Sequence, residues 1–326
     1  MGWFTSRGSK MTDSNPNWER DLITRIASDA IVEQRRRRRW GIFFKLLTFA
    51  YVTLILIMTV DWQARTDLGG GKKHTALVEL NGIIAPGAEA SAEKIMSGLQ
   101  AAFKDKSTQG VILRINSPGG SPVQSQLIYD EMRRLRKKYP DIPLYVVVED
   151  ICASGGYFVA SAADRIYVAK ASIVGSIGVL MNGFGFTGLM DKLGVERRLI
   201  TAGENKGMLD PFSPVDPKDV QHAKVLINDV HQQFISAVKE GRGKRLKESP
   251  DMFSGLIWTG DKSVDLGLAD AIGSLESVAR DVVKAEEIVD FSQKENVAEK
   301  LAKRFGMGAA SAVMEFVVRA SPLGIR

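Results

Sequence analysis

The sequence predicts an α/β fold in which buried strands alternate with helices. Of the 326 residues, 44% are hydrophobic, which is enough for a sizeable core. Short segments rich in β-branched residues recur along the chain, and segments whose apolar residues have helical spacing stand between them. This order is typical of stacked βα units, because helices that join parallel strands cover the faces of the sheet.

The predicted elements begin at residue 75 and follow one another closely. The first five are a strand at 75–84, a helix at 91–103, a strand at 110–116, a helix at 123–139 and a strand at 143–149. Farther along, strands are predicted at 164–169 and 195–201. A long helix is predicted from Pro217 to about Glu240, because Asp216 is a good N-cap residue and proline is favoured in the first turn.

An apolar segment, 40–60, precedes these elements and contains one charged residue, Lys45. As a helix it would be about 30 Å long, which matches the hydrocarbon core of a bilayer. Five arginines at 35–39 lie directly before it, so the positive-inside rule places the N-terminus in the cytoplasm and the rest outside. No signal-peptidase site closes the segment, which therefore predicts a permanent signal anchor. The alternative is a helix buried in a protein core.

The predicted organisation has five parts. They are a basic cytoplasmic segment at 1–39, a transmembrane signal anchor at 40–61, a linker at 62–74, a folded domain at 75–290 and an amphipathic C-terminal tail at 291–326. The first part holds nine Arg and Lys against five Asp and Glu, and so carries +4 of the formal charge of +6. The remaining residues are close to neutral, which argues against a nucleic-acid partner. The single cysteine, Cys152, excludes a disulfide framework.

Two glycine-rich segments stand where predicted strands end. The first is NSPGGS at 116–121, and the second is ASGG, in which Ser154 opens a helical run. A serine at a helix start, with glycines that let a substrate backbone approach, is a candidate nucleophile. Amides around Gly119, Gly120 and Gly155 could then hold the oxyanion of a tetrahedral intermediate. The alternative interpretation is that the first segment is a simple turn and the second a helix N-cap.

A nucleophilic serine needs a base, and none of the three histidines lies in a glycine-rich context. Two of them, His222 and His231, are nine residues apart on opposite faces of one helix, which argues against a shared metal site. Lys206, in TAGENKGMLDPF, is the other candidate base, and Ser176 could orient it without adding charge. Lowering a lysine pKa from about 10.4 by roughly 3 units takes about 4 kcal/mol of desolvation, so this lysine would have to be buried on assembly. The alternative is a solvated loop lysine.

These segments together resemble the bacterial signal peptide peptidase A family, membrane-bound serine peptidases of the ClpP/crotonase fold with stacked ββα units. The resemblance runs from about residue 75 to 274, through the motifs NSPGG, DICASGGYFVASAAD, ASIVGSIGV, GENKGMLDPF and WTGDKSVDLGLAD. It implies that Ser154 is the nucleophile and that Lys206, 52 residues later, is the general base. It also implies that Ser176 supports the lysine and that the NSPGG glycines and Gly155 form the oxyanion hole. Asn205 departs from the family, which often has an aromatic residue before the lysine.

The resemblance implies the short, single-copy form of the family, which assembles into homo-oligomeric rings. A Ser154–Lys206 pair formed across a subunit boundary would bury the lysine only on assembly. The implied substrates are hydrophobic peptides, chiefly remnant signal peptides, with no metal or cofactor. Residues 40–60 would contact membrane lipid, and the catalytic domain would lie on the periplasmic side of the bacterial inner membrane.

Three alternatives remain at this stage. A crotonase-type acyl-CoA enzyme would share the fold, but the orientation of the anchor separates it from a cytoplasmic cofactor. A related membrane peptidase that acts on stomatin-like partners usually carries further membrane spans. A catalytically silent membrane-anchored scaffold would keep the fold without the activity, and the presence of both Ser154 and Lys206 argues against it.

Overall fold

The computed structural model describes residues 18–59 and 72–293, with side chains omitted for 18–32 and 55–59. The chain divides into two compact units, one of Met1–Leu68 with Glu295–Arg326 and one of Gly69–Lys294. All that follows on the sheet and the candidate site concerns the second unit.

The first unit contains one long helix, α1 (Trp18–Thr59). The predicted membrane span, 40–60, lies in this helix, although residue 60 and the side chains of 55–59 fall outside the described part. Among the described residues, no helix combines the length and the apolar character needed to cross a bilayer. Nearly all of the predicted C-terminal tail also falls outside the described residues.

The described strands of the second unit form one eight-stranded sheet, whose main order is β6-β5-β3-β2-β1-β8. Their bounds are β1 His74–Asn81, β2 Thr108–Ser117, β3 Leu144–Ala153, β4 Arg165–Val168, β5 Ile173–Gly175, β6 Ile257–Thr259, β7 Ala271–Ile272 and β8 Ile288–Asp290. Within this part of the chain all pairs are parallel except β5 with β6. The predicted mixed α/β fold is therefore confirmed.

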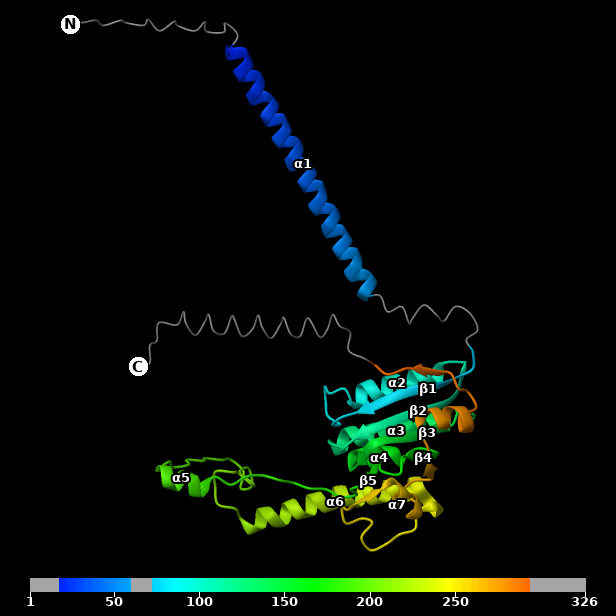
Figure 1. Ribbon diagram of the computed structural model, residues 1–326. Coiled ribbons are helices and arrows are strands. Elements are labelled where there is room, and N and C mark those ends of the chain that lie inside the picture. The colour runs from blue at the N-terminus through cyan, green and yellow to red at the C-terminus, as the bar shows by residue number, and fades with distance from the viewer. Residues whose placement is uncertain (1–17, 60–71, 294–326) are drawn as a thin grey trace, which may run out of the picture. The chain divides into compact units, whose positions relative to one another are not determined.

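Helices cover both faces of the sheet (Figure 1). The larger core lies beneath α2 (Ala92–Lys104), α3 (Pro122–Lys138), α4 (Gly155–Ala160) and the C-terminal half of α6 (Pro217–Arg242). The opposite face carries α8 (Leu275–Ser277) and the short π-helix η3 (Val278–Val283). Successive strand residues point to opposite faces, so Leu113 and Ile115 of β2 belong to the larger core and Ile112 to the smaller one.

The sheet branches at β3. The first half of β3 pairs with β4, from Tyr145 opposite Arg165, and β4 in turn pairs with β7. The last residues of β3 pair instead with β5, from Ile151 opposite Ile173. This branching places the carboxyl end of β3 between β2 and β5, where the glycine-rich loops follow.

An arm extends from this sheet between β5 and α6. It contains residues 178–216, the short helix α5 (Thr187–Leu193) and the N-terminal part of α6, and α5 lies well away from α4 (Figure 1). The predicted start of α6 is confirmed, because the Asp216 side chain accepts a hydrogen bond from the Lys218 N–H at 2.8 Å. Two further short helices, η2 (Gly243–Arg245) and α7 (Gly260–Asp265), follow it.

The predicted strand at 195–201 is wrong. These residues form an irregular segment of the arm in which every residue is exposed, and they pair with no described strand. Their β-forming side chains are typical of a strand, but a strand needs a neighbouring strand with which to pair. The described residues of the arm contain no such strand. The predicted strands at 75–84, 110–116, 143–149 and 164–169 correspond to β1 to β4, and the helices at 91–103 and 123–139 to α2 and α3.

Candidate active site

Three loops meet at the carboxyl edge of the sheet because of the register of β3. On one side Cys152 of β3 lies opposite Ser117 of β2, and on the other side Ala153 lies opposite Gly175 of β5. Ser154, the residue that follows β3, therefore comes beside Ser176, the residue that follows β5. The carboxyl ends of parallel strands are the usual place for ligand sites in α/β proteins.

The backbone at Ser154 has a conformation that is uncommon for any residue other than glycine. Its φ is 50° and its ψ is −123°, while its N–H donates to the Gly175 carbonyl at 2.9 Å. The hydroxyl of this partly buried residue makes no capping hydrogen bond to α4. Strained backbone at the entrance of a cavity is a feature of functional sites. The alternative role of Ser154 as a helix N-cap is therefore not supported.

The glycines of NSPGG allow the β2 loop to lie directly against Ser154 and Gly155. Gly119 has φ +98°, and a Cβ there would lie 2.6 Å from the Gly155 nitrogen. Its own N–H donates to the Ser117 hydroxyl at 3.1 Å. Gly120 is similarly confined, because a Cβ there would lie 2.2 Å from the Ile84 carbonyl oxygen.

Two backbone N–H groups remain available at this point. Within the part of the chain that the structure describes, neither the Gly120 nor the Gly155 N–H has a hydrogen-bond acceptor. The two groups are close, since a Cβ on Gly155 would lie 3.3 Å from the Gly120 nitrogen. Paired, preorganised N–H donors beside a serine can stabilise a developing oxyanion. Of the three predicted oxyanion glycines, Gly119 has its N–H occupied and serves the close approach of the loops instead.

A cavity of about 570 Å³ adjoins these groups. Ser154, Gly155, Gly120 and Ser176 all line it. Part of its apolar lining comes from α4 and α6, in the side chains Phe158, Val230 and Phe234. A concave, mostly apolar site with a few polar groups at one end suits a peptide with an apolar side chain.

Lys206 does not line this cavity. It is exposed in a turn of the arm, and the neighbouring Leu209 N–H donates to Asp219 at 3.2 Å, near the start of α6. The cavity contacts α6 at Val230, and the helix rises about 16 Å between Asp219 and that residue. Within one subunit the structure therefore brings together Ser154, Ser176 and the glycines, and it leaves Lys206 in the arm.

Comparison with known proteins identifies related peptidases. The model of peptidase family S49 matches residues 136–289, and the model of Clp protease matches residues 78–174. A putative protease of Methanocaldococcus jannaschii is 32% identical over 269 residues, which cover 78% of this chain and 85% of that protein. The chain belongs to peptidase family S49. The predicted resemblance to the signal peptide peptidase A family is thereby confirmed, and the Clp protease match supports the α/β fold.

Two further relatives extend the comparison of this S49 chain. A putative signal peptide peptidase SppA of Enterococcus faecium is 29% identical over 230 residues, 68% of this chain and 66% of that protein. A protein of Brucella abortus named Na(+)/H(+) antiporter NhaA is 49% identical over 182 residues, which are 56% of this chain. The matched part is 25% of the Brucella protein, so this chain spans only a quarter of that relative.

Among the described residues, no histidine lines the cavity beside Ser154. His74 is buried on β1, stacked against Phe291, and His222 is exposed on α6. His231 donates from Nε2 to the Ile177 carbonyl at 3.1 Å. A Ser-His-Asp triad is therefore not formed in this subunit, and no group of potential metal ligands occurs among the described residues.

Cys152 is fully buried in β3, two residues before Ser154. Burial raises the pKa of its thiol above the ordinary value. Because the thiolate is the reactive form, this cysteine is a packing residue rather than a nucleophile.

Sequence reasoning missed Ser117, the serine of the NSPGG motif. Its hydroxyl donates to the Gly82 carbonyl at 2.6 Å and accepts the Gly119 N–H at 3.1 Å, so it holds the loop in shape. The available signal was its position at the end of a predicted strand, immediately before a proline and two glycines.

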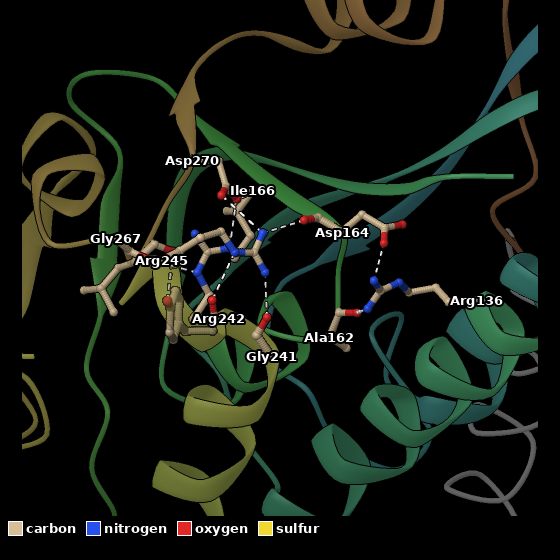
Figure 2. A network of polar contacts seen from close by, with 11 residues as sticks. Arg136, Ala162, Asp164, Ile166, Gly241, Arg242, Arg245, Gly267 and Asp270 are labelled. Carbon is tan, nitrogen blue, oxygen red and sulfur yellow. Dashed lines mark hydrogen bonds and ion pairs between the residues drawn. The ribbon is translucent and has the colours of Figure 1, made fainter. Parts of the chain in front are cut away.

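A buried ion-pair network at the C-terminal end of α6 was also missed (Figure 2). Arg242, whose side chain is 0% exposed, donates to Asp270 at 2.8 Å and to the Gly267 carbonyl at 2.9 Å. Arg245 donates to Asp270 at 3.2 Å. Burial raises the pKa of Asp270, but the hydrogen bond and charge of Arg242 outweigh it, and the pKa lies below its usual value. The network fixes the helix whose middle lines the cavity.

Proposed function

We propose that this chain is a membrane-anchored serine endopeptidase in which Ser154 is the nucleophile and Lys206 is the general base. The observation that carries the proposal is the position of Ser154, on strained backbone, beside two free N–H groups and at the mouth of an apolar cavity. Membership of peptidase family S49 supports the same reaction class.

The proposed reaction proceeds in two steps. The Ser154 hydroxyl attacks the scissile carbonyl, its proton passes to the Lys206 amine, and the Gly120 and Gly155 N–H groups stabilise the oxyanion. Lys206 then returns the proton to the leaving amine, and the peptide remains as an acyl ester on Ser154. Lys206 then takes a proton from a water molecule, which attacks the ester carbonyl; the ester bond breaks, the substrate leaves as a carboxylic acid, and Lys206 returns the proton to the Ser154 oxygen.

The proposed base comes from a neighbouring subunit of a ring-shaped homo-oligomer. Lys206 is exposed in one subunit, and the arm that carries it also exposes large apolar side chains, including Leu180 (79%), Phe184 (81%) and Ile200 (95%). Apolar surface of this kind is typical of protein interfaces. Self-association through the arm would cover it and would desolvate the Lys206 amine, which favours the neutral, basic form.

The proposed substrates are hydrophobic peptides, chiefly signal peptides that remain after their release from preproteins. The apolar cavity beside Ser154 suits their side chains, and the Enterococcus relative is named a putative signal peptide peptidase. The proposed membrane anchor at 40–60 would place the domain near such peptides, on the periplasmic side of the bacterial inner membrane. The proposed reaction uses no cofactor.

The experiment is the hydrolysis of a hydrophobic signal peptide by the full chain in detergent. We expect Ser154→Ala and Lys206→Ala to abolish turnover while fold and oligomeric state persist. Lys192→Ala, which removes an exposed lysine from the same arm, is the matched control and should keep activity. Mixing the two inactive variants before assembly should restore part of the activity, because some sites would then combine an intact Ser154 with an intact neighbouring Lys206.

Three outcomes would contradict parts of the proposal. Activity in Lys206→Ala would mean that another group is the base. Failure of the mixture to recover activity, with mixed oligomers demonstrated, would overturn the pairing across subunits. An inert wild-type chain that does not react with a serine-directed fluorophosphonate would favour a catalytically silent scaffold.

A further inference from the structure

One wall of the Ser154 cavity is the segment 176–180, which follows β5. Ser176, Gly178, Val179 and Leu180 of this segment all line the cavity. Ser176 is also the hydroxyl predicted to orient the base, so the position of this wall bears on both the shape of the cavity and the proposed proton transfer.

The wall has little regular structure of its own. Ser176 has φ 52°, a conformation that side chains other than glycine rarely adopt. Two hydrogen bonds hold its backbone, from the Ser176 N–H to the Leu256 carbonyl at 2.7 Å and from the Gly178 N–H to the Ser176 carbonyl at 2.9 Å. Contacts from outside the segment must therefore keep it in place.

His231 supplies such a contact from α6. Its Nε2 lies 3.1 Å from the carbonyl oxygen of Ile177, the residue between Ser176 and Gly178. A carbonyl can only accept, so Nε2 carries the hydrogen and the ring donates. Ile177 is fully buried and His231 is partly buried, which shields this bond from competition by water.

The helix that carries His231 is itself firmly held. Val230 and Phe234, on either side of His231 in sequence, line the same cavity, and Phe234 packs against Phe158 of α4 with ring centroids 5.1 Å apart. Farther along, the buried Arg242 ties the end of α6 to Asp270. A hydrogen bond from this helix therefore gives the wall a rigid reference point.

We propose that His231 is a positioning residue that holds the 176–180 wall, and with it Ser176, beside Ser154. The inference rests on the proposed function and deepens it. His231 touches neither the nucleophile nor the proposed base, and it acts only through the Ile177 carbonyl.

The test compares two substitutions in the full-length protein. His231→Leu removes the donor at similar side-chain volume, whereas His231→Gln keeps an N–H donor at a similar distance from the backbone. Gln232→Leu, at the next, exposed position of α6, controls for the loss of a polar helix residue. The measurements are kcat and KM on an apolar peptide, together with hydrogen exchange of the Ser176 and Gly178 amides.

We expect His231→Leu to lower kcat about five- to tenfold, the effect of one lost hydrogen bond, and to speed exchange of both amides. His231→Gln should restore kcat to within about twofold, and Gln232→Leu should match wild type. When Ser176→Ala is already present, His231→Leu should lower kcat by only about twofold or less, because both residues act through one segment.

The outcomes separate this inference from the proposed function. Unchanged exchange and kcat in His231→Leu would overturn the positioning role while leaving peptidase activity standing. An equal decrease in kcat from His231→Leu in the wild-type protein and in Ser176→Ala would also overturn it, because the effect would then not act through Ser176. If the wild type cleaves no peptide but His231→Leu still speeds hydrogen exchange of the Ser176 and Gly178 amides, the positioning role of His231 would be supported and the proposed function contradicted.

Discussion

At the scale of single residues, the candidate site depends on backbone conformations that most side chains avoid. Ser154 and Ser176 both have positive φ, at 50° and 52°, and they stand side by side at the ends of β3 and β5. Gly119 lets the β2 loop lie within contact distance of Ser154 and Gly155. The tight approach aligns the free N–H groups with the serine.

The first prediction concerns Gly119. In Gly119→Ala the new Cβ would lie 2.6 Å from the Gly155 nitrogen and 2.8 Å from the Ser154 Cβ, so the loops must separate. Misplacing one oxyanion donor typically costs about 100-fold or more in kcat/KM, and we expect a loss of that size. Activity on a signal peptide, with the thermal midpoint measured alongside, checks the result.

Gly87→Ala is the matched control for this prediction. Gly87 also has a positive φ, +73°, but a Cβ there would meet nothing within 4 Å. The Gly87→Ala variant should have a similar backbone strain, about 1–2 kcal/mol, and should keep its peptidase activity. Equal activity losses in both variants would show that strain, rather than the collision at Ser154, explains the effect.

At the scale of elements, α6 has two distinct halves. Its N-terminal half carries the exposed arm, and its C-terminal half packs against α4 and lines the cavity through Phe234. Close approach of the two helices depends on Gly241, where a Cβ would lie 1.9 Å from the Ser161 carbonyl oxygen. This contact at the C-terminal end of α4 and the Phe158–Phe234 ring contact hold the two helices together.

The second prediction tests this contact with Gly241→Ala. The added methyl group forces α6 away from α4, and overpacking of this kind costs about 1–3 kcal/mol. In a domain of this size we expect the thermal midpoint to fall by about 5–10 °C. Gly188→Ala, in the exposed helix α5 where a Cβ meets nothing, should leave it unchanged or slightly higher. An unchanged midpoint in Gly241→Ala would show that the helices can separate at little cost.

At the scale of the whole domain, a polar network joins elements from distant parts of the chain (Figure 2). Asp270 accepts from Arg242 at the end of α6, from Arg245 of η2 and from the Ile166 N–H of β4 at 2.7 Å. Nearby, Arg136 of α3 pairs with Asp164. Breaking a buried pair leaves an uncompensated charge, so this network makes the packing of these elements interdependent.

The third prediction is that Asp270 contributes to acid sensitivity. The pKa of Asp270 in the folded state lies below the unfolded value of about 3.9. The stability that its charge contributes to the fold is therefore complete above about pH 4 and is lost as the pH falls through the folded pKa. Asp270→Asn should therefore be less stable than wild type at pH 7, with a difference that narrows toward pH 3. Urea midpoints across this pH range measure it.

A surface carboxylate provides the control for this pH dependence. Asp265→Asn removes an exposed partner of Lys262, 3.7 Å away, and should follow the wild-type curve closely. A constant difference between Asp270→Asn and wild type from pH 7 to pH 3 would contradict the assigned role of the Asp270 charge.

Much of the fold could be predicted because it follows from residues close together in the chain. The apolar runs of β1, β2 and β3, the helical spacing of α2 and α3, and the Asp216-Pro217 start of α6 all carry local signals. The segment at 195–201 carried a similar signal and yet forms no strand. Its outcome depends on whether another strand lies beside it, which local pattern cannot indicate.

The candidate site divides in the same way. Ser154, Lys206, Ser176 and the glycines could be selected from motifs, but the motifs did not show which of them meet. Ser154 and Ser176 meet because β3 pairs with β5 at its end, and this pairing depends on the branching of the sheet. The cavity lining from Phe158 and Phe234 joins side chains of α4 and α6 that lie far apart in the chain.

By itself, the sequence determined the elements from β1 to β4 and the start of α6, because these have local signals, and its motifs indicated the family and, by resemblance, the candidate catalytic residues. Only the tertiary structure decided that the Gly119 N–H is occupied while those of Gly120 and Gly155 are free, and that His231 reaches the Ile177 carbonyl. It also decided that Lys206 stands apart from Ser154 within one subunit. These are contacts between distant segments, and their geometry arises only when the sheet, α4 and α6 pack together.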